Sequence, residues 1–270
     1  MAVRLLALDL DGTLIHDMTD IPPRSARAVR AAVERGVRVT LATGREYAAT
    51  EPYARQLNLN APLICYQGGL IQDHRNGQAQ IGEALPLASA RRIIDWAREE
   101  GLALIVYTGD GLYAETISPL MAGLLAKVKV SPRRVRDLRA AVQVPPIKCL
   151  LVERAESARQ RVVQLQAALG NDAVKVFQSY PTIIEAMPSS VSKGRALAKL
   201  ARQLGIPQAN VMAVGDQDND VEMIAWAGLG VAMRDGSPAA RAAADVIAPP
   251  VTEEGVAWAI ERFILSEEGR

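Results

Sequence analysis

The chain has 270 residues, of which 49% are apolar and 23% are charged, enough material for one large domain or two modest ones. Lys and Arg total 31 against 30 acidic residues, so no basic field exists to hold a nucleic-acid backbone. The apolar runs are too short for a membrane span, and acids follow the first run too early for a signal peptide. We therefore expect a cytoplasmic protein with no nucleic-acid, membrane or obligate protein partner.

The two cysteines, Cys65 and Cys149, lie far apart in the sequence, each inside an apolar run. A chain of this length can build its core without a disulfide. We therefore expect two free, buried thiols.

The first 80 residues alternate short apolar runs with amphipathic stretches. The pattern predicts strands at 4–8, 37–42 and 62–66, and helices at 23–35 and 45–57. Continuous apolar strands separated by helices are typical of a parallel sheet that is covered on both faces.

The same alternation returns after residue 190. Helices are predicted at 193–204 and 219–227, and strands at 211–215, 228–233 and 245–249. The two ends of the chain are therefore expected to build one α/β domain together.

The middle of the chain has another pattern, in which each of two helices, at 88–100 and 157–169, is combined with a hairpin. We interpret this region as a separate α+β domain inserted into the first. The expected division is a core of 1–82 and 190–270 with an insert of 83–189.

Reactive side chains directly follow three of the predicted strands. They stand in DLDGT (9–13), in TGR (43–45) and in GD (215–216). In an open parallel sheet, ligands bind at the carboxyl ends of the strands. We therefore expect these three clusters to meet, although they are far apart in the sequence.

Asp9 and Asp11 form the first pair of acids, and Asp216 supplies a third carboxylate. Carboxylates beside an anionic substrate repel it unless a cation joins them, and oxygen ligands suit Mg²⁺ better than zinc. One carboxylate can then attack phosphorus, while the other protonates the leaving alcohol and later activates water. A lone aspartate after a strand is commonly a turn or N-cap residue, but the whole DLDGTL context favours chemistry.

The other candidates also have structural alternatives. Thr43 and Gly44 can hold a phosphoryl oxygen, although Thr43 could equally be an N-cap. Arg45 could reach a substrate or pair on the surface. Lys193 begins a helix, where a cation opposes the helix dipole, so a nearby anion would explain its position; read alone, it is a solvated lysine.

The segment GDQDND (215–220) places several polar side chains at the start of a helix. Asn219 and Asp220 could orient ligands, waters or Lys193, whereas Asp218 is expected to face solvent. Acidic residues are favourable at a helix N-terminus in any case, so this segment alone does not establish a site.

Four segments of this chain resemble, in order, the motifs of the haloacid-dehalogenase-like hydrolases: DLDGTL (9–14), TG (43–44), Lys193 and GDQDND (215–220). The resemblance extends to the Cof-type phosphatase subfamily through LATGR, SKGRALAKLARQLGI, GDQDNDVEMIAWAG, GVAM and EEGVAWAI. It covers nearly the whole chain and is firmest in the two core segments.

The resemblance implies an α/β fold with a Rossmann-like core and an inserted cap. It implies Asp9 as the nucleophile, Asp11 as the general acid and base, and Mg²⁺ held by Asp9, the Asp11 carbonyl and Asp216. The phosphate contacts that it implies come from the Leu10 amide, Thr43, Gly44, Lys193 and Asn219.

Two positions depart from the family pattern. Gln67-Gly68-Gly69 stands where Asn-Gly-Ala is usual, and Glu254 stands where an aspartate is expected. The first change could alter how this loop meets the substrate, and neither change touches the expected transfer chemistry.

The preferred hypothesis is a Mg²⁺-dependent phosphatase that takes a small phosphorylated metabolite, such as a sugar phosphate, through an aspartyl-phosphate. A phosphoryl transferase of the mutase type is the alternative enzyme, and it would give isomerised phosphate esters rather than free phosphate. A non-enzymatic receiver module also uses acids, Mg²⁺ and a lysine, but receivers are much shorter and carry no inserted domain.

Overall fold

The computed structural model describes residues 2–16, 20–81, 84–128, 130–170 and 173–266. The chain divides into two compact units, Met1–Gly82 with Ser192–Arg270, and Glu83–Val191. The first predicted boundary, at residue 82, lies outside the described residues. The second division falls close to residue 190, where the core was expected to resume.

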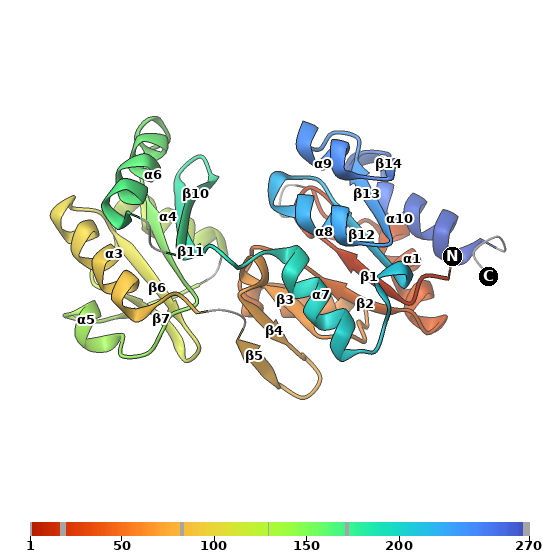
Figure 1. The fold of residues 1–270 in the computed structure, drawn as a ribbon, viewed down its shortest axis with the longest axis horizontal. Coiled ribbons are helices and arrows are strands. Elements are labelled where there is room, and N and C mark those ends of the chain that lie inside the picture. The colour runs from red at the N-terminus through yellow and green to blue at the C-terminus, as the bar shows by residue number, and fades with distance from the viewer. Residues whose placement is uncertain (1, 17–19, 82–83, 129, 171–172, 267–270) are drawn as a thin grey trace. The chain divides into compact units, whose positions relative to one another are not determined.

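The first unit is built on a five-stranded parallel sheet (Figure 1). Its strands, in the order β14-β13-β12-β1-β2, are Val246–Ala248, Leu229–Met233, Val211–Gly215, Leu5–Leu8 and Arg38–Leu41. The central pair joins the two sequence-distant halves of the unit, with Leu5 opposite Val211 and Leu8 opposite Val214. This register brings the residues that follow β1 and β12 to the same edge of the sheet.

Helices cover both faces of this sheet. They are α1 (Pro23–Glu34), α2 (Tyr47–Gln56), α7 (Lys193–Gln203), α8 (Val221–Trp226), α9 (Pro238–Ala243) and α10 (Gly255–Ile260). Helices α7, α8 and α9 share a core cluster with Leu5 and Ala7 of β1, whereas α1 packs against α10. Leu6 and Leu8, which point to the other face, are buried as well. The predicted parallel α/β core is therefore confirmed.

The strand predicted at 62–66 does not belong to this sheet. It is β3 of a small antiparallel sheet whose order is β3 (Leu63–Cys65), β4 (Leu70–Gln72) and β5 (Ala79–Ile81). One parallel bridge, between Ala42 and Ile64, links β3 to the chain after β2. The apolar run looked like another parallel strand because its sequence does not show that the chain turns back at η1 (Tyr66–Gly68).

Shorter elements complete the first unit. They are η2 (Gln208–Asn210), η3 (Asp218–Asp220), η4 (Val251–Glu253) and the π-helical η5 (Glu261–Leu265). The helix predicted at 219–227 is in fact a 3₁₀ turn followed by α8, so the acidic motif lies in a turn ahead of the α-helix.

The second unit is an α+β layer, as the pattern of helices and hairpins predicted. Its sheet has the order β10-β11-β9-β6-β7-β8, with bounds Val174–Tyr180, Ile183–Pro188, Lys148–Val152, Leu104–Thr108, Gly111–Ala114 and Arg133–Arg134. Its helices are α3 (Leu87–Glu99), α4 (Pro119–Val128), α5 (Leu138–Ala141) and α6 (Ala155–Leu169). Helices α3 and α6 share a core cluster with alternate residues of the strands, such as Leu104 and Val106.

Both cysteines are free and buried, as expected. Over the part of the chain that the structure describes, none of the helices combines the length and the apolar character needed to cross a bilayer.

Candidate active site

A buried cluster of charges lies at the carboxyl edge of the core sheet. Lys193 Nζ donates hydrogen bonds to Asp9 Oδ1 and to Asp220 Oδ1, each at 2.6 Å. Carboxylate oxygens of Asp9, Asp216 and Asp220 lie within 4.8 Å of one another. Lys193 is only 1% exposed. The structure thus brings together side chains from the ends of β1 and β12 and the start of α7.

Local sequence explains why Lys193 reaches this cluster. Ser192 is the N-cap of α7, and its hydroxyl oxygen accepts a hydrogen bond from the Arg195 amide at 3.1 Å. A Cβ on Gly194 would lie 2.7 Å from the Glu222 backbone, so only glycine lets α7 approach α8 this closely. The close approach places the first residue of α7 beside Asp220, whose carboxylate offsets the unfavourable helix dipole.

Asp216 is fixed by two neighbours that the sequence analysis did not single out. Thr13 Oγ1 donates to Asp216 Oδ1, and Gln217 Nε2 donates to Asp216 Oδ2, both at 2.8 Å. Gly12 has φ +85°, and a Cβ there would lie 2.4 Å from Asp216 Oδ2. The turn after β1 therefore supports the carboxylate after β12, and both supporting side chains stand inside motifs that the sequence already marked.

Asp220 accepts hydrogen bonds from the backbone around Asp216 and from Lys193. Its Oδ2 accepts hydrogen bonds from the backbone amides of Asp216, at 2.9 Å, and Gln217, at 3.0 Å, while its Oδ1 accepts from Lys193. Asp220 is fully buried. It therefore holds the loop after β12 and the lysine in one arrangement, in line with the orienting role considered for it.

The electrostatics of this cluster are unbalanced. Burial, and then repulsion from Asp220, raise the pKa of Asp9 well above its ordinary value, although Lys193 opposes this. Burial and Asp220 also raise the pKa of Asp216, against hydrogen bonds from Thr13 and Gln217. Burial alone would lower the pKa of Lys193, but Asp220 and Asp9 outweigh it and raise that pKa. Three carboxylates share one ammonium, so an oxygen-ligated divalent cation fits this donor set.

Asp11 lies apart from the buried cluster. Its carboxylate, 44% exposed, accepts a two-point ion pair from Arg45, with Arg45 Nε at 2.7 Å and the terminal nitrogen at 2.5 Å. The Arg45 guanidinium also lies 5.6 Å from the centre of the Tyr53 ring. Two roles were considered for Arg45, a substrate contact and an ion pair. The structure shows an ion pair, and its partner is Asp11, the predicted general acid and base.

Thr43 and Gly44 lie next to a residue that the sequence analysis had noted only as a departure. The Thr43 hydroxyl oxygen accepts from the Arg45 amide at 3.1 Å, and a Cβ on Gly44 would meet the amide nitrogen of Gln67 at 2.4 Å. Gln67 Oε1 accepts from Asn219 Nδ2 at 2.9 Å. Gln67 therefore links the loop after β2 to the loop after β12.

The backbone at Gln67 is unusual. Tyr66 and Gln67 both have positive φ, 52° and 57°, and Gly68 follows with φ 99°. Two adjacent non-glycine residues in the left-handed region cost energy and persist only where surrounding contacts hold them. The strained turn directs the Gln67 side chain to Gly44 and Asn219, which no local sequence pattern indicated.

The other two positions singled out from the sequence lie away from the charges. Asp218 is exposed, as expected. Glu254 adopts a left-handed conformation, φ 55°, and its carboxylate accepts a hydrogen bond from the Ser25 amide in the first turn of α1 at 2.7 Å. Glu254 therefore caps α1 from a distant segment, and its replacement of an aspartate leaves the charged cluster unaltered.

A parallel α/β core that gathers carboxylates and a buried lysine at the carboxyl ends of its strands is the arrangement of an α/β enzyme, and that edge is the candidate active site. The chain belongs to the haloacid dehalogenase-like hydrolase family, whose model matches residues 6–260. The resemblance seen in the sequence motifs is therefore confirmed, and so is the prediction that this chain is a hydrolase.

Known proteins from several bacteria are similar to this chain over most of its length. The 5-amino-6-(5-phospho-D-ribitylamino)uracil phosphatase YcsE of Bacillus subtilis is 29% identical, with 97% of this chain and 96% of that protein covered. The HMP-PP phosphatase of Serratia proteamaculans is 30% identical, with 87% and 85% covered. A haloacid dehalogenase-like hydrolase from Bacteroides thetaiotaomicron has the same fold, with a TM-score of 0.87, 30% identity and coverage of 96% and 99%.

Proposed function

We propose that this chain is a Mg²⁺-dependent phosphatase that hydrolyses small phosphomonoesters through an aspartyl-phosphate on Asp9. The observation that supports this most is the buried cluster in which Lys193 bridges Asp9 and Asp220 beside Asp216. A single ammonium leaves that cluster with a net negative charge. A divalent cation would balance this charge and allow an anionic phosphoryl group to approach. The phosphatases among the relatives agree with this proposal.

Asp9 performs the first chemical step. One of its carboxylate oxygens attacks phosphorus, the bond from phosphorus to the ester oxygen breaks, and that oxygen takes a proton from Asp11 and leaves as an alcohol. Lys193 holds Asp9 in place and faces the charge that the phosphoryl oxygens gain. Asp9 is thereby left as a mixed anhydride of aspartate and phosphate.

Asp11 performs the second step. Now ionised, it removes a proton from water while the water oxygen attacks phosphorus; the bond from phosphorus to Asp9 breaks and inorganic phosphate leaves. The exposed pair with Arg45 keeps the Asp11 carboxylate outside the buried cluster, on the side open to solvent. During each catalytic cycle, the Asp11 carboxylate must break its ion pair with Arg45 and contact the substrate oxygen instead.

The remaining contacts bind and orient the phosphoryl group. Asp9, Asp216 and the Asp11 carbonyl would hold Mg²⁺, which when bound neutralises and polarises phosphoryl oxygens. The phosphoryl contacts that we propose come from the Leu10 amide, Thr43, Gly44, Lys193 and Asn219. Gln67 fixes the side chain of Asn219 and thereby acts as a positioning residue.

Release of phosphate from p-nitrophenyl phosphate tests the proposal directly. We expect turnover with Mg²⁺ and loss of turnover with EDTA. Stoichiometric labelling of the protein without turnover would instead favour a receiver, and a rearranged ester without free phosphate would favour a transferase. A folded, Mg²⁺-loaded protein that leaves every phosphate ester intact would refute the proposed function.

A panel of phosphorylated metabolites then defines the substrate class. Sugar phosphates belong in it, together with 5-amino-6-(5-phospho-D-ribitylamino)uracil and HMP-PP, the compounds that the relatives' names give. We expect kcat/KM to differ among these compounds and to be highest for the natural substrate class; p-nitrophenyl phosphate without Mg²⁺ serves as the background.

A further inference from the structure

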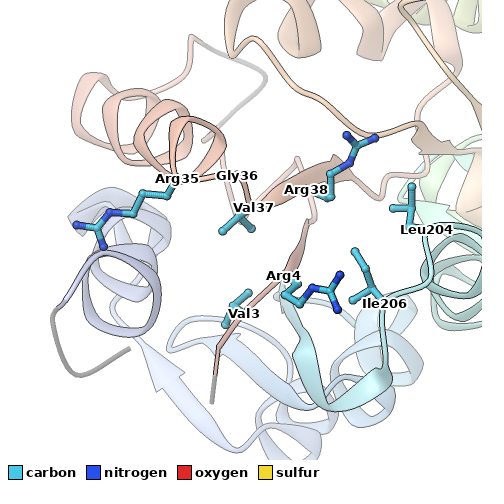
Figure 2. A pocket seen from close by; sticks show the side chains of 8 residues that line it. All are labelled: Val3, Arg4, Arg35, Gly36, Val37, Arg38, Leu204 and Ile206. Carbon is cyan, nitrogen blue, oxygen red and sulfur yellow. The ribbon is translucent and has the colours of Figure 1, made fainter. Parts of the chain in front are cut away.

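A cavity of about 390 Å³ lies at the amino edge of the core sheet (Figure 2). Arg4 and Arg38 line it, but Arg4 is exposed and Arg38 turns its guanidinium away from the cavity. Arg4 and Asp9 are five residues apart along the chain, which is roughly 16 Å in an extended strand. A donor better placed for a ligand lies instead at the carboxyl edge, in the turn Tyr66–Gly68.

The backbone of this turn is fastened to the loop after β2. The Tyr66 amide donates to the Arg45 carbonyl at 2.9 Å, and the Gln67 amide donates to the Thr43 carbonyl at 3.0 Å. Both contacts reach the TGR segment from which phosphate contacts are expected. They also explain how Tyr66 and Gln67 keep positive φ values, which need support from the surroundings.

One end of the Gln67 carboxamide is bonded and the other end is open. Oε1 accepts a hydrogen bond from Asn219 Nδ2 at 2.9 Å. Nε2 lies 2.4 Å from the place that a Cβ on Gly44 would occupy, so it packs directly on this glycine. Among the residues that the structure describes, none accepts a hydrogen bond from Nε2, although Gln67 is only 7% exposed. Nε2 is therefore a donor that is fixed in place and still available.

The position of Nε2 is what an anionic ligand needs. Gly44 is one of the residues to which the proposed function gives a contact with the phosphoryl group, and Nε2 lies beside it. A donor on a nearly buried side chain is costly unless an acceptor completes it. Support of Asn219 requires only Oε1, so that role leaves the placement of Nε2 over Gly44 unexplained. A neutral amide also adds no charge that would disturb the ion pairs of Lys193.

We propose that Gln67 is a phosphate-binding residue, in which Nε2 donates a hydrogen bond to an oxygen of the phosphoryl group while Oε1 holds Asn219. This inference rests on the proposed function and adds to it a contact from outside the four motifs, at a position where this chain has Gln-Gly-Gly instead of Asn-Gly-Ala. A hydrogen bond to an anion is stronger than one between neutral groups, so its loss should be measurable as a loss of affinity.

Affinity for inorganic phosphate tests this contact, because phosphate carries no leaving group. Calorimetry in the presence of Mg²⁺ gives its dissociation constant for the wild type and for Gln67→Met, which keeps the length of the side chain and removes both polar ends. We expect Gln67→Met to bind phosphate at least about tenfold more weakly. Gln56→Met is the matched control, because Gln56 is the exposed last residue of α2, and this variant should bind phosphate as the wild type does.

An Asn219→Ala background separates the two ends of the carboxamide. This variant has already lost the bond to Oε1, while the backbone hydrogen bonds of the turn still hold Gln67. Any further loss on addition of Gln67→Met therefore arises from Nε2, and we expect it to be at least about threefold. No further loss would show that Gln67 acts only through Asn219 and would overturn the proposal.

Two further measurements keep the outcomes distinct. If Gln67→Met is less stable than the wild type, Gln67→Gly is measured instead, since glycine adopts a φ of 57° without strain, and it should show the same loss of affinity. Turnover of p-nitrophenyl phosphate by the wild type tests the proposed function by itself. Absence of that turnover would remove the proposed function and this contact with it. Turnover together with equal phosphate affinity in Gln67→Met and the control would overturn the contact alone.

Discussion

The two edges of the core sheet carry opposite charges, but the charged cluster of the carboxyl edge is buried, whereas Arg4 at the amino edge is exposed. At the carboxyl edge, Asp9, Asp216 and Asp220 share the ammonium of Lys193. At the amino edge, Arg38 has a buried nitrogen without a partner among the described residues. Three buried carboxylates with one ammonium mark a place for a cation, whereas Arg4 is exposed to solvent and Arg38 lies near Asp73 and Arg75, so charge at a strand end does not by itself mark a site.

Removal of the proposed nucleophile at the carboxyl edge should have the largest effect on activity. Asp9→Asn keeps the size of the side chain and removes the attacking carboxylate, so we expect kcat to fall by about 10³-fold or more. Phosphate release under saturating substrate measures it. Asp218→Asn is the control, because that exposed acid lies in the same motif as Asp216. Wild-type turnover by the Asp9→Asn variant would remove Asp9 from the mechanism.

Removal of the lysine should cost both rate and stability. In Lys193→Met, two buried carboxylates lose their ammonium, so we expect kcat/KM to fall by about 10²-fold to 10³-fold. The free energy of unfolding should fall by about 3 kcal/mol, because a buried pair has lost one partner. Lys199→Met, on the same helix, is the control. A change confined to KM would contradict the role given to Lys193.

Addition of Mg²⁺ should stabilise the protein more at pH 8 than at pH 5. The folded pKa values of Asp9 and Asp216 lie above their unfolded values, so without a cation stability is lost as pH rises through that interval. At low pH, protons occupy the oxygens that the cation needs. At 100 times its dissociation constant, Mg²⁺ adds about 3 kcal/mol to the unfolding free energy. Thermal melting at constant ionic strength measures this, and Asp216→Asn should show a smaller rise.

A smaller effect is expected at the residue that links two loops of the acidic edge. Gln67→Ala and Asn219→Ala each remove the hydrogen bond between these side chains, so the double variant should lose less than the two single losses combined. We expect a coupling of about 1 kcal/mol in kcat/KM. These variants form a double-mutant cycle, in which the cost in activity of placing alanine at the positive φ of Gln67 cancels. Strictly additive losses would show that Gln67 does not position Asn219.

The sequence was sufficient to predict the parts of the site that follow directly from strand ends. Asp9 and Asp216 come straight after apolar runs, and parallel strands put their carboxyl ends at one edge. Lys193 could be placed at the start of a helix because Ser192 is a good N-cap. These predictions depend on local patterns and on the geometry of a parallel sheet.

Other features depend on contacts that no local pattern records. The pairing of Asp11 with Arg45 joins side chains 34 residues apart, and Gln67 meets Asn219 across 152 residues. The return of the chain after β3 requires positive φ at Tyr66 and Gln67, which non-glycine residues rarely adopt. Long-range packing, rather than propensity, decides such features.

The smallest effect is expected when the amino edge is changed and the carboxyl edge is assayed. A unit charge roughly 16 Å from another changes its energy by only about 0.3 kcal/mol in water, and salt screens it further. Arg4→Gln with Arg38→Gln should therefore leave kcat/KM for p-nitrophenyl phosphate within about twofold of the wild type. A fall of more than about fivefold cannot come from such a screened charge. It would mean that the amino edge acts on Lys193 through α7, which has Lys193 at its start and Leu204 as its C-cap, and that the two edges are coupled rather than independent.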